Sequence, residues 1–297
     1  MPFASGLERS LALVCLACLP VLFFAGHASA QNDPEWTTPF PPFRIAGNLY
    51  YVGSKRLASY LITTPQGNIL INSDLEANVP MIRASIEKLG FPFKDTRILL
   101  ISHAHFDHDA GSAKIKELTG AAYMVMDADV PVVESGGKAD FQYGNRPEFL
   151  YPPVKVDLVL HDGDQVSLGG TVLDAHFTPG HTKGCTTWTM KVTEAGKTYD
   201  VVIVGGPYVN PGYKLVHNPA YPGIAEDYER MWRVLKSLPC DIFLGAHGSY
   251  FDLEEKYARS KETGANPFID PAGYKKFVAE AEQEFRTRLA IQKRTSN

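Results

Sequence analysis

Residues 103–108 read His-Ala-His-Phe-Asp-His and are separated only by Ser102 from a largely apolar run at 97–101 that predicts a buried strand. Three imidazoles and a carboxylate within six residues suit a core poorly, because each buried polar group needs its own partner. They suit a metal site well, since neutral imidazole nitrogen and carboxylate oxygen both bind zinc at about 2.0–2.2 Å. A turn after a strand can direct alternate side chains at two points in one cavity. We therefore expect His103, His105, Asp107 and His108 to be zinc ligands.

Two further histidines stand in similar settings. His181 follows a predicted strand that ends at Phe177, and His247 follows a predicted strand at 241–244. Strand ends are where parallel-type architectures gather their sites, so both are expected ligands. Six ligands can serve two zinc ions with open positions, and a water held there has its pKa lowered toward about 7. That chemistry is hydrolysis. The other histidines of the mature chain are expected to be structural: His161, His176 and His217.

Alternating strand and helix signals predict an α/β protein. Expected strands lie at 49–52, 59–63, 68–72, 97–101, 158–160, 166–177, 186–192, 200–204 and 241–245. Expected helices lie at 79–89, at 224–238 and from Asp270-Pro271 onward. Two similar halves, about 31–150 and 151–297, predict one domain, a four-layer αββα sandwich with a cleft between the halves.

Composition is that of an ordinary globular protein. The 297 residues are 44% hydrophobic and 21% charged, with a formal net charge of −4. Such a balance gives no electrostatic reason to expect nucleic acid or an anionic membrane as a partner.

The first thirty residues predict an export signal. An apolar run at 11–25 is short for a membrane span and is followed by the small-residue pattern Ala28-Ser29-Ala30. We expect cleavage after Ala30 and a mature domain at 31–297, periplasmic or secreted, with no membrane attachment; the alternative is an uncleaved anchor. Two cysteines remain after cleavage, Cys185 and Cys240, and they do not make a disulfide framework.

The motif at 103–108, with His181 and His247, resembles the signature of the metallo-β-lactamase superfamily. The resemblance implies the metallo-β-lactamase fold and covers nearly the whole mature chain. Lactonases and thioester hydrolases of this superfamily place a metal-bridging aspartate at a later strand end, and two lactamase subclasses place a cysteine there. Here residues 202–207 read Val-Ile-Val-Gly-Gly-Pro, with neither. The ligand set is therefore similar to subclass B3, as are the stretches at 211–213, 226–228 and 238–241.

What the resemblance implies is a zinc-dependent β-lactamase. His103, His105 and His181 would hold the first zinc, and Asp107, His108 and His247 the second. A hydroxide between the metals would attack the lactam carbonyl, with Asp107 orienting it. By the family fold, Cys185 and Cys240 lie apart and both are free. The expected partner is a small β-lactam, and the protein is taken to be a monomer.

Substrate contacts are less defined, because this chain departs from the family there. Several members carry serines before the Pro-Gly-Tyr stretch, where this chain has Pro-Tyr-Val-Asn at 207–210. Asn210, Tyr213 or Lys214 would replace them. The irregular segment 134–153 carries Phe141 and Tyr143, and long irregular loops often act as lids; the alternative is a surface loop whose aromatic residues pack on the body.

Two other functions remain open. One is another di-zinc hydrolase of this fold, a lactonase or thioester hydrolase. The other is a non-catalytic exported zinc-binding protein that kept the site.

Overall fold

The structure is a computed structural model that describes residues 33–262 and 264–295. Residues Pro34–Asn297 form one compact unit. The expected export signal at 1–30 lies outside the described residues. Within the described part, no helix combines the length and the apolar character needed to cross a bilayer.

The first sheet has seven strands in the order of the chain. They are β1 (Phe43–Ala46), β2 (Leu49–Tyr51), β3 (Tyr60–Thr64), β4 (Gly67–Ile71), β5 (Thr96–Leu100), β6 (Ala122–Met126) and β7 (Leu158–Leu160). Neighbours pair antiparallel from β1 to β4 and parallel from β4 to β7.

The second sheet has five strands in the order β12-β11-β10-β9-β8. They are β8 (Gln165–Leu168), β9 (Thr171–Phe177), β10 (Thr186–Glu194), β11 (Lys197–Val204) and β12 (Ile242–Gly245). All pairs are antiparallel except β11 and β12, which run parallel.

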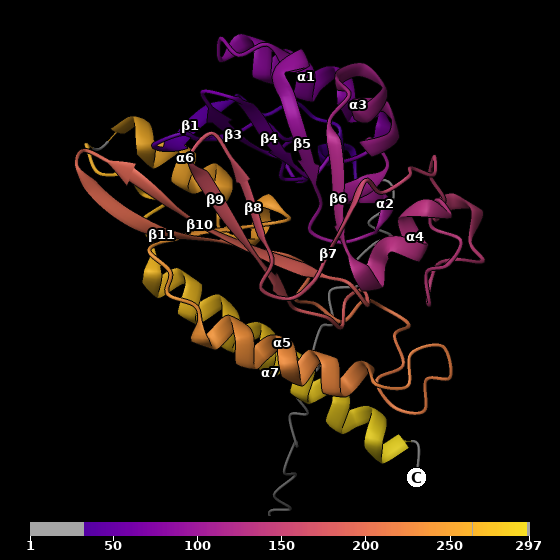
Figure 1. Ribbon diagram of the computed structural model, residues 1–297. Helices are drawn as coiled ribbons and strands as arrows, with labels where there is room; N and C mark the ends of the chain where they lie inside the picture. The colour runs from indigo at the N-terminus through magenta and orange to yellow at the C-terminus, as the bar shows by residue number, and fades with distance from the viewer. Residues whose placement is uncertain (1–32, 263, 296–297) are drawn as a thin grey trace, which may run out of the picture. The chain divides into compact units, whose positions relative to one another are not determined.

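Helices cover the outer faces of both sheets (Figure 1). Helices α1 (Val79–Lys88) and α3 (Ser112–Thr119) lie on the first sheet, and α5 (Ile224–Ser237) and α7 (Pro271–Thr295) on the second. The remaining helices are α2 (Phe106–Asp109), α4 (Val130–Glu134) and α6 (Leu253–Glu262), with short 3-10 turns at Pro34–Trp36, Glu76–Asn78, Phe93–Asp95, Asp127–Asp129, Pro147–Phe149 and Gly248–Tyr250. The four-layer αββα sandwich of the metallo-β-lactamase fold is confirmed.

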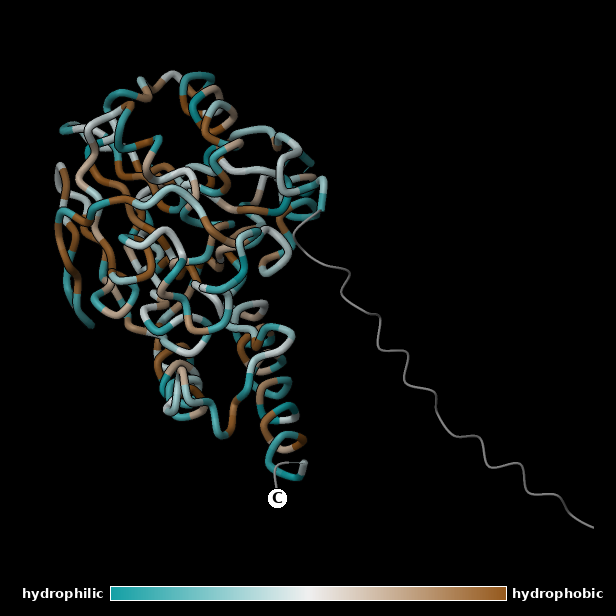
Figure 2. Tube along the Cα trace, turned by 90° about the vertical axis from the view of Figure 1, so that its right-hand side faces the viewer, coloured by the Kyte–Doolittle hydropathy of each residue, from teal (hydrophilic) through white to brown (hydrophobic). Residues whose placement is uncertain are grey.

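The period of two along each strand explains the layers. Ile69 and Ile71 of β4 belong to the core cluster that joins the sheets, whereas Leu70 between them packs with α1 and α3. Trp188 of β10 is fully buried and donates from Nε1 to the carbonyl of Ile101, 3.0 Å away, across the two sheets. Figure 2 shows the apolar segments gathered in the strands of the interior.

One expected strand, at 166–177, is wrong. It is a hairpin of β8 and β9 that turns at Gly169 and Gly170, whose φ angles are 53° and 89°. Those angles suit glycine, and a Cβ on Gly169 would meet the Thr64 hydroxyl at 2.4 Å.

The first sheet also continues past residue 150, because β7 pairs with β6. Strands β1 and β6 and helices α3 and α6 were not among the expected elements.

Candidate metal centre

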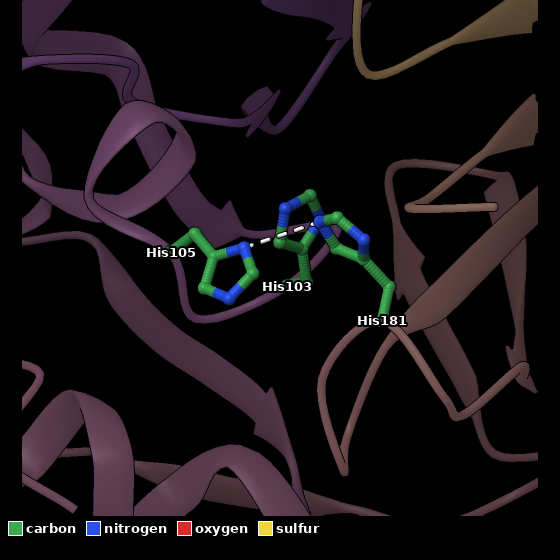
Figure 3. Close-up of side chains that lie close together, drawn as sticks. All are labelled: His103, His105 and His181. Atoms are coloured by element: carbon green, nitrogen blue, oxygen red, sulfur yellow. Dashed lines mark hydrogen bonds between the residues drawn. The ribbon is translucent and has the colours of Figure 1, made fainter. Parts of the chain in front are cut away.

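Three histidines from two loops converge at the end of the strands. His103 and His105 follow β5, and His181 follows β9 (Figure 3). Their ligand nitrogens all lie within 4.8 Å of one another, and His105 Nδ1 is 3.1 Å from His181 Nε2. All three side chains are buried. These residues, called the first triad below, are the expected ligands of the first zinc.

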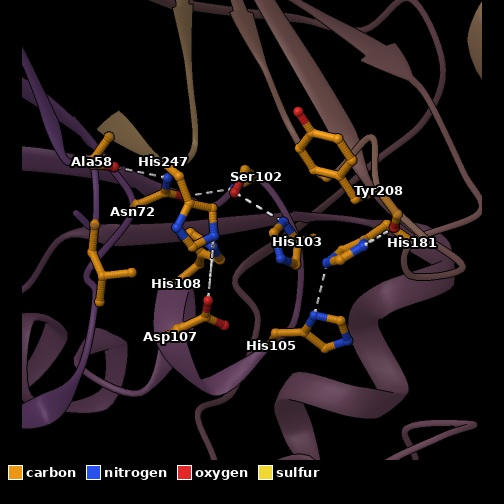
Figure 4. Close-up of polar contacts among 12 residues, drawn as sticks. Ala58, Asn72, Ser102, His103, His105, Asp107, His108, His181, Tyr208 and His247 are labelled. Atoms are coloured by element: carbon orange, nitrogen blue, oxygen red, sulfur yellow. Dashed lines mark hydrogen bonds and ion pairs between the residues drawn. The ribbon is translucent and has the colours of Figure 1, made fainter. Parts of the chain in front are cut away.

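The other three expected ligands also meet. Asp107 Oδ2 lies 3.2 Å from His108 Nε2 and 3.5 Å from His247 Nε2, and the two nitrogens are 3.1 Å apart (Figure 4). Asp107 and His108 lie on the single turn of α2, whereas His247 follows β12. This set is called the second triad. The two triads are neighbours, because the rings of His103 and His108 lie 4.3 Å apart.

The spacing of these atoms fits zinc. Two atoms that each lie about 2.05 Å from a tetrahedral ion are about 3.3 Å apart, close to the separations of 3.1, 3.2 and 3.5 Å in the second triad. In the first triad, His103 Nε2 is buried with no hydrogen-bond partner among the described residues. A buried polar atom of that kind needs a ligand. The residues therefore fit two metal ions.

The electrostatics keep the histidines ready to bind. Burial, with the neighbouring imidazoles adding to it, lowers the pKa of His103 well below its usual value. Burial likewise lowers the pKa of His181 to about 3 and that of His247 to about 3. All three are neutral imidazoles at pH 7, the form that coordinates a metal.

Asp107 is held in its ionised form. Burial alone would raise the pKa of its carboxyl, but electrostatic attraction and a hydrogen bond from His108, with the nearby imidazoles of His247 and His105, outweigh burial and lower the pKa strongly. The site therefore combines one firm negative charge with the neutral imidazoles of His103, His181 and His247; at His105 burial lowers the pKa, but the Asp140 carboxylate outweighs it and raises the pKa.

Asn72 positions the start of the loop at 103–108. Its Oδ1 accepts the amide of Ser102 at 2.8 Å, and its Nδ2 donates to the carbonyl of Ala58 at 3.0 Å. Asn72 has a φ of 65°, a conformation that asparagine tolerates better than most residues. The end of β4 is thereby tied to the strand end that carries the first ligands.

Asp129 joins the two loops that supply the first triad. Its buried carboxyl accepts the amide of Ala104 at 2.9 Å, the hydroxyl of Thr182 at 2.8 Å and the amide of Gly184 at 2.7 Å. Burial raises the pKa of Asp129 to about 6. The loop at 103–108 and the loop around His181 therefore share one buried anchor.

His181 is oriented by the segment after β11. Its Nδ1 donates to the carbonyl of Tyr208 at 2.7 Å, which leaves Nε2 as the ligand atom. A Cβ on Gly206 would lie 2.3 Å from the imidazole ring of His181. Gly206 thus leaves room for the imidazole ring of His181.

The segment 134–153 is irregular apart from its 3-10 turn, and its aromatic residues pack on the body. Tyr143 stacks on Phe149 at 4.3 Å and lies edge-on to His105 at 5.3 Å. Phe141 contacts both Tyr213 and Tyr221 at 5.0 Å. The loop therefore lies directly against the first triad.

The residues expected to contact substrate differ in their burial and in their hydrogen-bond partners. Tyr213 is buried, and its hydroxyl donates to the His181 carbonyl at 2.8 Å. Asn210 Nδ2 donates to the Tyr143 hydroxyl at 3.1 Å, and Lys214 is exposed. Their roles in binding, like those of Phe141 and Tyr143, stay predictions.

Three residues near the centre were missed in the sequence: Trp36, Asp129 and Asp140. Trp36 packs on Phe106 at 5.8 Å and lies 6.3 Å from His247. Asp140 Oδ2 lies 3.6 Å from His105 Nε2. None had a local signal, because each is a single residue in a loop or a short 3-10 turn.

The remaining histidines and cysteines follow expectation where the structure describes their contacts. His161 pairs with Asp164, and His176 hydrogen bonds Thr189. Cys185 and Cys240 are both free.

Comparisons with known proteins agree with this geometry. The sequence profile of the metallo-beta-lactamase superfamily matches residues 58–247. The native FEZ-1 metallo-beta-lactamase from Legionella gormanii is 62% identical, with a TM-score of 0.86 over 86% of this chain and 98% of that one. The class B3 di-zinc metallo-beta-lactamase LRA-12 from an Alaskan soil metagenome is 37% identical, with a TM-score of 0.82 over 86% and 97%.

A curated relative is matched over a shorter length. A probable metallo-hydrolase of Burkholderia pseudomallei is 32% identical over 167 residues, which are 55% of this chain and 54% of the relative. The chain thus spans about half the length of that relative but nearly all of the two solved lactamases. With both ligand triads in place, the chain belongs to the metallo-beta-lactamase superfamily.

Proposed function

We propose that this protein is a subclass B3 metallo-β-lactamase that opens the amide bond of β-lactam antibiotics. The proposal rests on the two adjacent triads. The first triad consists of three histidines, and the second consists of an aspartate and two histidines. The 62% identity to FEZ-1 over nearly the whole of that lactamase supports the same activity.

Two zinc ions are the implied cofactors, one held by each triad. When bound, they would supply an activated water as nucleophile and positive charge to polarise the lactam carbonyl. The chain's own residues determine where this happens. Ser102 and Tyr208 hydrogen bond the outer nitrogens of His103 and His181, which aims the inner nitrogens at one point.

Asp107 contributes charge as well as ligation. Its carboxylate stays ionised, so one oxygen can ligate while the other accepts a hydrogen bond from the attacking water. The carboxylate thus fixes the direction in which the water's lone pair points.

Aromatic side chains form an apolar wall beside the second triad. Trp36 packs on Phe106 at 5.8 Å, and Phe106 packs edge-on to Phe149 at 5.2 Å. Such a wall excludes water from one side of the site and suits the ring system of a β-lactam.

The N-terminal sequence supports a periplasmic or secreted protein, which is where β-lactams act on the cell wall. We expect cleavage after Ala30. Cell fractionation and N-terminal sequencing test this: a cytoplasmic protein that retains residues 1–30 would contradict it.

A hydrolysis panel tests the activity. The purified protein is assayed on a penicillin, a cephalosporin and a carbapenem, with and without a chelator, beside a homoserine lactone and a thioester. We expect chelator-sensitive opening of at least one β-lactam. Turnover of the lactone or thioester alone would instead identify another di-zinc hydrolase, and no turnover at all a zinc-binding protein.

A further inference from the structure

The segment 134–153 brings a carboxylate to a metal ligand. The side chain of Asp140 is only 4% exposed, although it lies in a loop. Its Oδ1 accepts the amides of Gln142 at 2.8 Å and Tyr143 at 2.6 Å, which fixes the turn of the loop. Its Oδ2 lies 3.6 Å from His105 Nε2. One carboxyl group therefore holds the loop together and faces the first triad.

With zinc bound at Nδ1, His105 would carry its proton on Nε2, the nitrogen that faces Asp140. His105 Nδ1 points at His181 Nε2, 3.1 Å away, and is the ligand atom. A neutral imidazole that ligates through Nδ1 carries its hydrogen on Nε2. That hydrogen needs an acceptor, because His105 is buried.

Two oxygens compete for this hydrogen. Tyr213 Oη lies 3.4 Å from His105 Nε2 and can accept there, because its own hydrogen is given to the His181 carbonyl. The Asp140 carboxylate is charged, and hydrogen bonds to charged acceptors are about twice as strong as neutral ones. The 3.6 Å separation is longer than a formed hydrogen bond, and such bonds often tighten only in the loaded site.

We propose that Asp140 is a positioning residue for the metal ligand His105, and that it couples metal binding at the first triad to the order of the loop at 134–153. The proposal rests on the di-zinc function above. A carboxylate behind a metal-binding histidine fixes its tautomer and orientation, and losing such a partner typically costs about 10–100-fold in metal affinity.

The coupling must act in both directions. If Asp140 strengthens metal binding, the bound metal stabilises the Asp140 contact by the same free energy. The amides of Gln142 and Tyr143, which donate to Asp140, should then exchange faster when zinc is removed. Hydrogen exchange of these amides reads out the loop without any substrate.

Asp140→Asn is the sharpest variant because it keeps the shape. Its amide oxygen can still accept the Gln142 and Tyr143 amides, which leaves the NH2 group facing His105 Nε2. Two donors then oppose each other, and the imidazole is driven to the tautomer with hydrogen on Nδ1, the ligand atom. We expect zinc affinity at the first triad to fall by about 10–100-fold, measured by competition with a fluorescent zinc chelator.

Two comparison variants keep the test interpretable. Asp157, like Asp140, accepts a backbone amide, in this case that of Tyr123, and it also pairs with Lys116. Asp157→Asn is therefore the matched control and should leave zinc affinity unchanged. Tyr213→Phe removes the competing acceptor. If Tyr213→Phe weakens zinc binding and Asp140→Asn does not, Tyr213 is the partner and the proposal is overturned.

Unchanged zinc affinity in a folded Asp140→Asn protein would also overturn it, as would zinc-independent exchange of both amides. If Asp140→Asn does not fold, the exchange experiment on the unmodified protein decides alone. Both readouts are independent of β-lactam turnover. A protein that shows the coupling but hydrolyses no β-lactam would refute the proposed activity and leave the role of Asp140 standing.

Discussion

The two triads are built from similar ligands but are supported differently. In the first triad, the outer ring nitrogens of all three histidines have a neighbouring polar group: the Ser102 hydroxyl at 3.2 Å, the Asp140 carboxylate at 3.6 Å and the Tyr208 carbonyl at 2.7 Å. In the second triad, His108 Nδ1 is buried and lacks a hydrogen-bond partner within the described part of the chain. The second site relies on the charge of Asp107 instead. The first site is therefore held by the orientation of its imidazole rings, and the second by the charge of Asp107.

The largest effect should come from breaking the first triad. His181→Ala removes one of three ligands, and we expect kcat/KM on β-lactams to fall by about a thousandfold, or about 4 kcal/mol of transition-state stabilisation. Chelation should have an effect at least as large. His161→Ala, at an exposed histidine that pairs with Asp164, is the matched control. Full activity in His181→Ala would show that the ligands are wrongly assigned.

Substitution of Asp107 in the second triad should remove one negative charge and one bound metal ion. Asp107→Asn keeps the shape but loses the ionised carboxylate, so we expect zinc content to fall from two ions per chain to one. Turnover should drop by about a hundredfold, because the attacking water also loses its oriented acceptor. Elemental analysis of the purified variant measures the zinc. Two tightly bound ions in Asp107→Asn would contradict the charge-based account of this site.

The different support of the two triads also predicts which of them binds metal first. Because the first triad has oriented rings, it should bind zinc about 10–100-fold more tightly than the second. Stepwise titration of metal-free protein with cobalt, followed by its visible absorption, would separate the sites. His247→Ala should lose the weaker site and His181→Ala the tighter one. If the site that remains in each variant binds cobalt with the same affinity, the two triads do not differ in metal affinity.

The anchor between the two loops of the first triad should matter for stability. Asp129→Asn leaves at least one of the three donors, from Ala104, Thr182 and Gly184, facing an NH2 group. We expect the free energy of unfolding to fall by about 1–3 kcal/mol in urea denaturation. Asp164→Asn, at an exposed carboxyl, is the control. Equal stability of the two variants would mean that Asp129 is not an anchor.

The smallest effect should come from the segment 134–153, which is expected from the sequence to act as a lid. Tyr143→Ala loses the stack on Phe149 and the edge contact with His105. Aromatic pairs contribute about 0.5–1.5 kcal/mol beyond area burial, so KM should rise by about three- to tenfold while zinc content stays at two. Steady-state kinetics with metal analysis measures both. An unchanged KM would reject the lid.

The sequence predicted the ligands because each carries its chemistry in its own side chain and follows a recognisable strand. Asp129 and Asp140 could not be found that way, since an acidic residue in a loop or a short 3-10 turn resembles any solvated surface position. Only in the folded chain does Asp129 accept the amide of Ala104 and Asp140 face His105. The hairpin at Gly169 and Gly170 is a different case: the glycine pair is a turn signal within the sequence, and the apolar residues on either side masked it.

The adjacent triads imply that six side chains hold two metal ions side by side. Anomalous diffraction at the zinc absorption edge, from crystals of the purified protein, tests it most directly. We expect two peaks, one bounded by the histidines at 103, 105 and 181 and the other by Asp107, His108 and His247. A single peak, or a side chain of His181 or His247 turned away from the metal, would contradict it.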